Sequence, residues 1–155
     1  MDDTAASLDQ SVGQDHADDE ALRHDPAQEA TRRAEDAPLV LIVEDEEPIA
    51  SVLAIIVEDM GYRPLTATHG KEALAVALKE HPALILTDLM MPYLDGAEFI
   101  SALHEAMDDG VRKTPPIVLM TAAGARQARA AGADALLLKP FNVDEVEAML
   151  RRFLG

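Results

Sequence analysis

The sequence contains no cysteine, which excludes disulfides, thiolate metal sites and a cysteine nucleophile. No apolar run approaches the roughly 18 residues that cross a bilayer, and the N-terminus lacks the basic start and apolar stretch of a secretory signal. Basic residues are also scarce, with 13 lysines and arginines against 29 acidic residues and a formal net charge of -16. Such a charge repels phosphate backbones. We therefore expect a cytoplasmic protein with no membrane insertion and no direct nucleic-acid binding.

The acidic residues concentrate at the N-terminus. Residues 1–37 hold eleven of them against three arginines, about half of the net charge, with few large apolar side chains and no sustained periodicity. Such a segment cannot bury enough surface to offset the entropy lost on ordering. We predict a disordered acidic extension over residues 1–37, with room for short helical pieces. Residues 38–155 are expected to form one folded domain, with no further domain after it.

Short apolar runs alternate with amphipathic stretches from Leu39 onward. Four of the runs are continuously apolar, which is typical of strands covered on both faces in a parallel sheet. They span residues 39–43, 83–86, 117–120 and 135–138, and a weaker run at 63–68 fits an edge strand. The pattern therefore predicts five strands.

The stretches between the runs repeat apolar residues at helical spacing. The first carries Ile49, Val52, Leu53, Ile56, Val57 and Met60, between Pro48 and Gly61. The others cover residues 73–78, 99–107, 124–131 and 143–153. Five strands alternating with five helices predict a doubly wound α/β domain with helices on both faces of a parallel sheet.

Polar residues follow four of the predicted strands, at the edge where ligands bind in doubly wound folds. Glu44 and Asp45 follow the first strand, Asp88 the third, Thr121 the fourth and Lys139 the fifth. Any one of these residues alone is commonly a helix cap. Four strands that deliver polar groups to one edge indicate a functional site.

Three carboxylates at one sheet edge repel each other by about 4 kcal/mol per close pair. Raised pKa values, salt bridges or a divalent cation would relieve this repulsion, and a set of oxygen ligands suits Mg²⁺. Lys139 adds a fixed positive charge, and Thr121 adds a hydroxyl donor. A carboxylate that faces a cation, an amine and a hydroxyl is arranged to accept a phosphoryl group.

Four motifs resemble the receiver domain of two-component response regulators. They are VEDEEPI at 43–49, TDLMMPYLDG at 87–96, MTA at 120–122 and KPF at 139–141. The resemblance covers about residues 38–154 and implies a flavodoxin-like fold with strand order 2-1-3-4-5. Since the fifth predicted helix runs to the last residues of the sequence, we expect a stand-alone receiver without an output domain. Such a protein signals by protein contact and is not an enzyme, since it has at most slow autodephosphorylation.

The resemblance also implies roles for the site residues. Asp88 would accept phosphate from a histidine of a sensor kinase or of a histidine phosphotransfer protein. Glu44, Asp45 and Asp88 would hold Mg²⁺ together with the backbone carbonyl of Met90. An unidentified downstream protein would read the phosphorylated state, from a monomer or from a phosphorylation-linked dimer.

Three further residues would contact the phosphoryl group. Lys139 would pair with it, Thr121 would move to hydrogen-bond it, and the backbone of Ala122 would bind it. The peptide bond between Lys139 and Pro140 is expected to be cis, an isomer accessible chiefly to proline.

Three positions bear on how this receiver would switch and on how long it would stay phosphorylated. The aromatic residue that usually lies three positions before the lysine is Leu136 here, which leaves two interpretations of this position, a switching role or simple packing. Met90 and Ala123 lie two positions after Asp88 and Thr121, where side chains are thought to orient attacking water. Neither can do so, and we predict a long-lived phospho-aspartate.

Two other functions fit parts of the pattern. A receiver-like interaction module with impaired switching would keep the site and lack the aromatic residue at Leu136. A haloacid-type Mg²⁺-dependent phosphohydrolase also uses a strand-end aspartate, but it wants a second acid where this chain has Met90.

The remaining polar candidates are expected to be structural. His69, His81 and His104 have no spacing that makes a metal site. Asp95 and Gly96 fit the cap and the turn before a helix.

Overall fold

The structure is a computed structural model that describes residues 25–107, 113–122 and 124–155. It divides into two units, Met1–Asp36 and Ala37–Gly155. In the first unit, α2 (Pro26–Asp36) is a polar helix without a buried residue, and Arg33 pairs with Glu29 one turn away at 2.6 Å. The end of the predicted acidic extension is thus a helical piece, and the disorder predicted for residues 1–24 lies outside the described residues.

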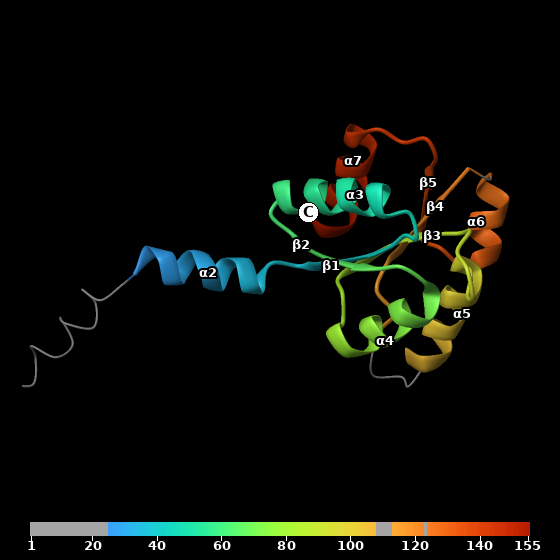
Figure 1. The fold of residues 1–155 in the computed structure, drawn as a ribbon, viewed down its shortest axis with the longest axis horizontal. Coiled ribbons are helices and arrows are strands. Elements are labelled where there is room, and N and C mark those ends of the chain that lie inside the picture. The colour runs from blue at the N-terminus through green and yellow to red at the C-terminus, as the bar shows by residue number, and fades with distance from the viewer. Residues whose placement is uncertain (1–24, 108–112, 123) are drawn as a thin grey trace, which may run out of the picture. The chain divides into compact units, whose positions relative to one another are not determined.

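A five-stranded parallel sheet in the order β2-β1-β3-β4-β5 forms the centre of the second unit (Figure 1). Its strands are β1 (Leu39–Val43), β2 (Arg63–Ala67), β3 (Leu84–Asp88), β4 (Ile117–Thr121) and β5 (Ala135–Leu138). Every residue of β1, β3 and β4 is buried, as continuously apolar runs require, whereas β2 and β5 are partly exposed edges. The predicted fold class and strand order are confirmed.

Among the described residues, five helices cover the two faces of the sheet. They are α3 (Glu47–Asp59), α4 (Gly70–Glu80), α5 (Gly96–Met107), α6 (Ala125–Ala131) and α7 (Val143–Leu154). Figure 1 shows α3 and α7 on one face of the sheet and α4 and α5 on the other. Val40 and Ile42 of β1 pack with residues of α3 and α7, while Leu41 and Val43 pack with residues of α4 and α5 around Phe99. Within the described part of the chain, no helix has the length and apolar character needed to cross a membrane.

Side-chain caps fix the starts of α4 and α5. Asp95 Oδ1 accepts a hydrogen bond from the Glu98 N–H at 2.8 Å, which confirms the predicted cap. His69 Nδ1 accepts one from the Glu72 N–H at 3.2 Å. His81 closes α4 in the left-handed conformation, with φ of 51°. The histidines at the two ends of α4 therefore have local structural roles.

Helix α3 departs from its predicted apolar stripe at one position. Leu53, Ile56 and Val57 are buried, but Val52 is 52% exposed. Ile55, one turn further along, is 57% exposed. The apolar surface of α3 therefore continues out of the core and onto the protein surface.

Candidate functional site

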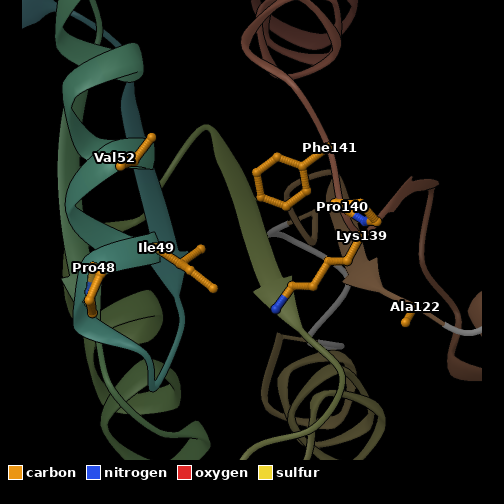
Figure 2. A pocket seen from close by; sticks show the side chains of 7 residues that line it. All are labelled: Pro48, Ile49, Val52, Ala122, Lys139, Pro140 and Phe141. Atoms are coloured by element: carbon orange, nitrogen blue, oxygen red, sulfur yellow. The ribbon is translucent and has the colours of Figure 1, made fainter.

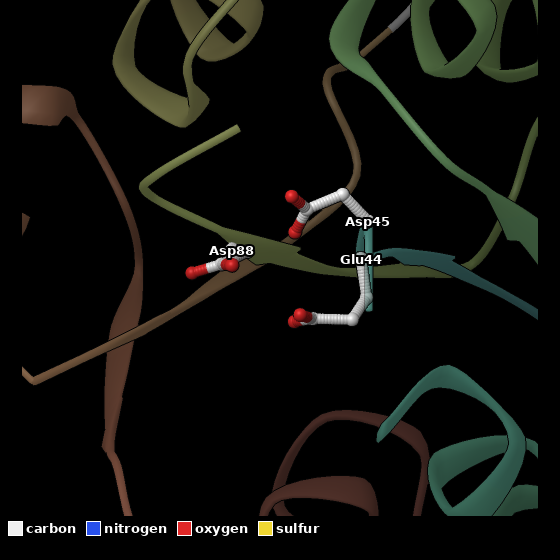
Figure 3. Close-up of side chains that lie close together, drawn as sticks. All are labelled: Glu44, Asp45 and Asp88. Carbon is white, nitrogen blue, oxygen red and sulfur yellow. The ribbon is translucent and has the colours of Figure 1, made fainter. Parts of the chain in front are cut away.

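Three carboxylates meet at the carboxyl edge of the sheet. Glu44 and Asp45 follow β1, and Asp88 ends the neighbouring strand β3. Figure 3 shows Glu44 and Asp45 reaching from the end of β1 toward Asp88. One ligand oxygen from each residue lies within 4.8 Å of the others. Among the residues that the structure describes, this is the one group of three or more acidic or histidine side chains that could hold a metal ion.

Lys139 brings a positive charge into this cluster from β5. Its Nζ lies 3.2 Å from Glu44 Oε2 and 3.3 Å from Asp88 Oδ2. Its backbone N–H donates to the carbonyl oxygen of Thr121 at 2.9 Å, which ties the end of β5 to the end of β4. The Lys139–Pro140 peptide bond is cis, as predicted. The structure thus brings together four of the predicted site residues, which are Glu44, Asp45, Asp88 and Lys139.

Burial makes the electrostatics of the cluster strong. Glu44 is 1% exposed, and burial, followed by the negative charge of Asp88, raises its pKa, although Lys139 offsets part of the effect. Burial lowers the pKa of Lys139, but the Asp88 and Glu44 carboxylates outweigh burial, so the pKa lies above its usual value. Lys139 therefore stays charged at neutral pH, and one lysine relieves only part of the repulsion between the acids.

One buried oxygen of the cluster has no hydrogen-bond donor among the described residues. Glu44 Oε1 is buried without a hydrogen-bond partner, while Oε2 of the same carboxylate faces Lys139. A buried acceptor of this kind calls for a positive or donating partner. Oxygen ligands from three acids, one of them unpartnered, fit a divalent cation such as Mg²⁺.

The structure describes four further residues that the sequence predicted for the site. Thr121 ends β4 and is buried, and the exposed Ala122 follows it. Met90 is 74% exposed in the loop after β3, and the use of its carbonyl as a metal ligand stays a prediction. Leu136 is half-buried in β5 and packs against the core, while its switching role stays a prediction. Ala123 lies outside the described residues.

A glycine contact that sequence patterns did not predict fixes the backbone of Asp88. The Gly96 N–H donates to the carbonyl oxygen of Leu89 at 2.8 Å. A Cβ at Gly96 would overlap the carbonyl oxygen of Asp88 and would lie 2.9 Å from Leu89 Cα. Gly96 is therefore more than a turn residue, because its lack of a side chain lets α5 touch the end of β3.

An apolar groove of about 600 Å³ borders Lys139, and sequence patterns did not predict it either. Figure 2 shows Ile49 and Val52 on α3 facing Phe141 and Lys139 across it. The groove is lined by Pro48, Ile49, Val52, Ala122, Lys139, Pro140 and Phe141. Val52 is the residue from which the groove could have been predicted, but its helical spacing indicated a position in the core.

The sequence pattern of the response regulator receiver domain matches residues 40–151, from β1 into α7. This range holds the three acids, Thr121 and Lys139 in the order that the sheet requires. The chain belongs to the response regulator receiver domain family. Receivers are phosphoacceptor signalling domains rather than enzymes, which decides against the phosphohydrolase alternative.

Curated relatives of this receiver are longer proteins. The probable transcriptional regulator ycf27 of Pyropia yezoensis is 38% identical over 119 residues, which cover 74% of this chain and 46% of that protein. Response regulator Rre1 of Synechocystis sp. is 35% identical over 121 residues, 75% of this chain and 51% of that protein. The receiver thus spans about half the length of the curated relatives that it matches.

Solved receiver structures share its fold. Chemotaxis response regulator CheY4 of Vibrio cholerae aligns with a TM-score of 0.69 and 33% identity, covering 76% of this chain and 99% of that one. The receiver domain of sensor histidine kinase PA1611 from Pseudomonas aeruginosa aligns with a TM-score of 0.68 and 29% identity, covering 77% and 98%. That structure has a magnesium ion coordinated in the active-site cleft. Receivers bind Mg²⁺ at an acidic site of this kind.

Proposed function

We propose that Asp88 accepts a phosphoryl group from a phosphohistidine of a sensor kinase or histidine phosphotransfer protein, and that the phosphorylated receiver signals by protein contact. The observation that carries this proposal is the position of Asp88 Oδ2, 3.3 Å from Lys139 Nζ within the three-carboxylate cluster. Because histidine kinases draw on ATP, the reaction belongs in the cytoplasm. The net charge of -16 favours protein partners over nucleic acid.

The side chains of the cluster divide the chemistry between them. An Asp88 carboxylate oxygen forms a bond to phosphorus as the bond between phosphorus and the donor's histidine nitrogen breaks. The electron pair of the broken bond stays on that nitrogen. Once the nitrogen is protonated, the donor's side chain is released as a neutral imidazole. Lys139 stabilises the charge on the transferring oxygens, and Thr121 supplies a hydroxyl donor from the end of β4.

Glu44, Asp45 and Asp88 would hold Mg²⁺ together with the backbone carbonyl of Met90. Bound there, the ion would offset the repulsion between the carboxylates and the negative charge of the incoming phosphoryl group. The unpartnered Glu44 Oε1 and the all-oxygen donor set support this assignment.

Small phosphodonors test the proposal without a kinase. Acetyl phosphate or phosphoramidate with Mg²⁺ should add one phosphoryl group to the protein, seen by mass spectrometry and removed by hydroxylamine, and Asp88→Asn should remain unmodified. Asp95→Asn is the matched control, since it removes a carboxylate from the same loop and keeps a capping side chain. If the wild-type protein forms no adduct, phosphoacceptance is wrong and an interaction module with impaired switching remains.

Mg²⁺ binding should tighten as the pH rises through the raised pKa of Glu44. Burial and Asp88 raise that pKa above 4.5, so without metal the group stabilises the fold at pH below 4.5 and loses this contribution as the pH rises. The ion needs the ionised carboxylate, so its affinity changes in the opposite direction. Calorimetric titrations at about pH 5 and about pH 8 should show tighter binding at the higher pH. Glu44→Gln should bind Mg²⁺ more weakly than the wild type does, and its affinity should depend less on pH. A wild-type Mg²⁺ affinity that is the same at the two pH values would contradict the assignment.

The apolar groove beside Lys139 is the surface on which we place the phosphodonor protein. A donor must bring its histidine to Asp88, so its contact surface must border Lys139. Val52 supplies an exposed apolar wall there, on a helix whose Leu53 and Val57 are buried in the core. Exposed apolar patches next to a reaction site are typical of protein contacts.

Val52→Asp should slow phosphotransfer from the donor protein about tenfold or more, because a charge in the centre of an apolar contact must be desolvated. Phosphorylation by acetyl phosphate should stay unchanged, since a small donor does not use the groove. Ile55→Asp is the matched control: it is similarly exposed on the same helix but does not line the groove. Equal loss in both variants, or loss with acetyl phosphate, would argue against docking at this place.

A further inference from the structure

We propose that the N-terminus of α4 positions the loop of residues 89–95, and with it the predicted Met90 ligand, through a contact between His69 and Tyr93. We call this loop the acceptor loop. The inference rests on the proposed function, because it concerns the geometry of the same metal and phosphoryl site.

Tyr93 occupies a backbone conformation that its own side chain disfavours. Its φ is 71°, in the left-handed region that residues with a Cβ rarely adopt. The side chain is 83% exposed, so burial does not hold it there. Its ring lies edge-on to the His69 imidazole, with centroids 5.8 Å apart and an interplanar angle of 72°. A strained backbone conformation of this kind persists when the surrounding residues fix it. The structure describes one such neighbour of the Tyr93 ring, the imidazole of His69.

The neighbouring residues of both segments are packed even more closely. A Cβ at Gly70 would lie 2.7 Å from the Leu94 carbonyl oxygen and 2.8 Å from Leu94 Cβ. The start of α4 therefore touches the acceptor loop at two successive residues, His69 against Tyr93 and Gly70 against Leu94. Two adjacent contacts fix both the position and the direction of the loop at this point.

The imidazole of His69 cannot turn away without breaking the helix cap. Its Nδ1 accepts a hydrogen bond from the Glu72 N–H at 3.2 Å. Glu72 Oε2 in turn accepts from the N–H and the hydroxyl of Thr68 at 3.1 and 3.0 Å. The ring against which Tyr93 rests is thus held by the first turn of α4.

Met90 lies between two anchors of the acceptor loop. On the C-terminal side of Met90 the loop is held at Tyr93 and Leu94 by α4, and the backbone before Met90 is held by the bond from the Gly96 N–H to the Leu89 carbonyl oxygen. Mutation of a residue that holds a metal ligand in place commonly weakens metal binding by about 10- to 100-fold. Release of the Tyr93 anchor would therefore weaken Mg²⁺ binding by freeing the Met90 carbonyl.

Four variants separate the ring contact from the cap and from the backbone. His69→Asn keeps a capping acceptor and removes the ring. Tyr93→Asn keeps a residue that tolerates the left-handed region and removes the ring, whereas Tyr93→Phe keeps the ring. We expect His69→Asn and Tyr93→Asn each to raise the Mg²⁺ dissociation constant about tenfold, and the double variant to raise it no further. Tyr93→Phe should bind Mg²⁺ and unfold thermally as the wild type does, and all four variants should unfold in a single cooperative transition without Mg²⁺.

Amide hydrogen exchange without Mg²⁺ gives a second readout. The Leu94 N–H donates to Pro92 and the Gly96 N–H to Leu89, both at 2.8 Å. His69→Asn should speed exchange at Leu94 and Gly96 and leave the strands unchanged. Wild-type exchange or wild-type Mg²⁺ affinity in His69→Asn would overturn the inference. If the wild-type protein itself neither binds Mg²⁺ nor accepts a phosphoryl group, the proposed function fails, and the exchange experiment alone decides whether α4 holds the loop.

Discussion

Lys139→Met should destabilise the protein without Mg²⁺ by about 3 kcal/mol, because it removes one partner from a largely buried ion cluster. Lys139 Nζ lies within 3.3 Å of two carboxylates, and the Glu44 side chain has no exposed surface. We take the low end of the usual range since the lysine side chain keeps 23% exposure. Phosphorylation by acetyl phosphate should fall about 100-fold or more, the usual effect of removing a donor that stabilises developing charge.

Mg²⁺ separates the two effects of Lys139. A bound ion restores a positive charge among the carboxylates, so it should recover much of the lost stability. It should not recover phosphorylation, because it does not replace the amine beside Asp88. Denaturant unfolding with and without Mg²⁺ measures the first effect, and mass spectrometry measures the second. Lys71→Met on the exposed start of α4 is the control and should change the stability by less than about 0.5 kcal/mol.

An unfolding midpoint of Lys139→Met equal to that of the wild type would contradict this account. Protonation of Glu44 limits the cost of losing the lysine, because a neutral carboxyl group needs no counter-charge. The destabilisation should therefore increase as the pH rises through the raised pKa of Glu44. A loss that is the same at all pH values would place its origin in packing rather than in charge.

The sheet and the centre of the site could be predicted from local sequence. Continuous apolar runs such as 39–43 have one stable environment in a domain of this size, a strand covered on both faces. Parallel strands end at a common edge, so the residues that follow them converge without any knowledge of the loops. Glu44, Asp88 and Lys139 meet for this reason, although 95 positions separate the first from the last.

The features that sequence could not predict depend on contacts between separate segments. Helical spacing shows that Val52 belongs to the apolar side of α3, but it does not show where the core ends and the groove begins. The contact between His69 and Tyr93 joins two loops whose relative position no periodicity encodes. The tight approach of Gly96 to Asp88 depends on how the acceptor loop turns.

The helix over residues 26–36 has a weak local signal in the sequence. The i,i+4 pair of Glu29 and Arg33 stabilises such a helix by a few tenths of a kcal/mol.

Gly96→Ala should destabilise the protein by about 2–3 kcal/mol, although the usual effect of this substitution in a helix has the opposite sign. In an open helical position, alanine stabilises by about 0.5–1 kcal/mol relative to glycine. At the start of α5 the added Cβ would overlap the Asp88 carbonyl oxygen and press on the Leu89 backbone. Neither group is a flexible side chain, so α5 or the end of β3 must move. Phosphorylation should fall with stability, because the displaced segment carries Asp88.

Gly124→Ala provides a matched control for this prediction. Gly124 stands just before α6, and a Cβ there would meet nothing within 4 Å. The same chemical change should therefore be neutral or slightly stabilising at Gly124, and phosphorylation should be unchanged. Denaturant unfolding of the two variants compares identical substitutions that differ in surroundings alone. Wild-type stability and wild-type phosphorylation in Gly96→Ala would show that the end of β3 can shift without cost, and that the phosphoacceptor position does not depend on its contact with α5.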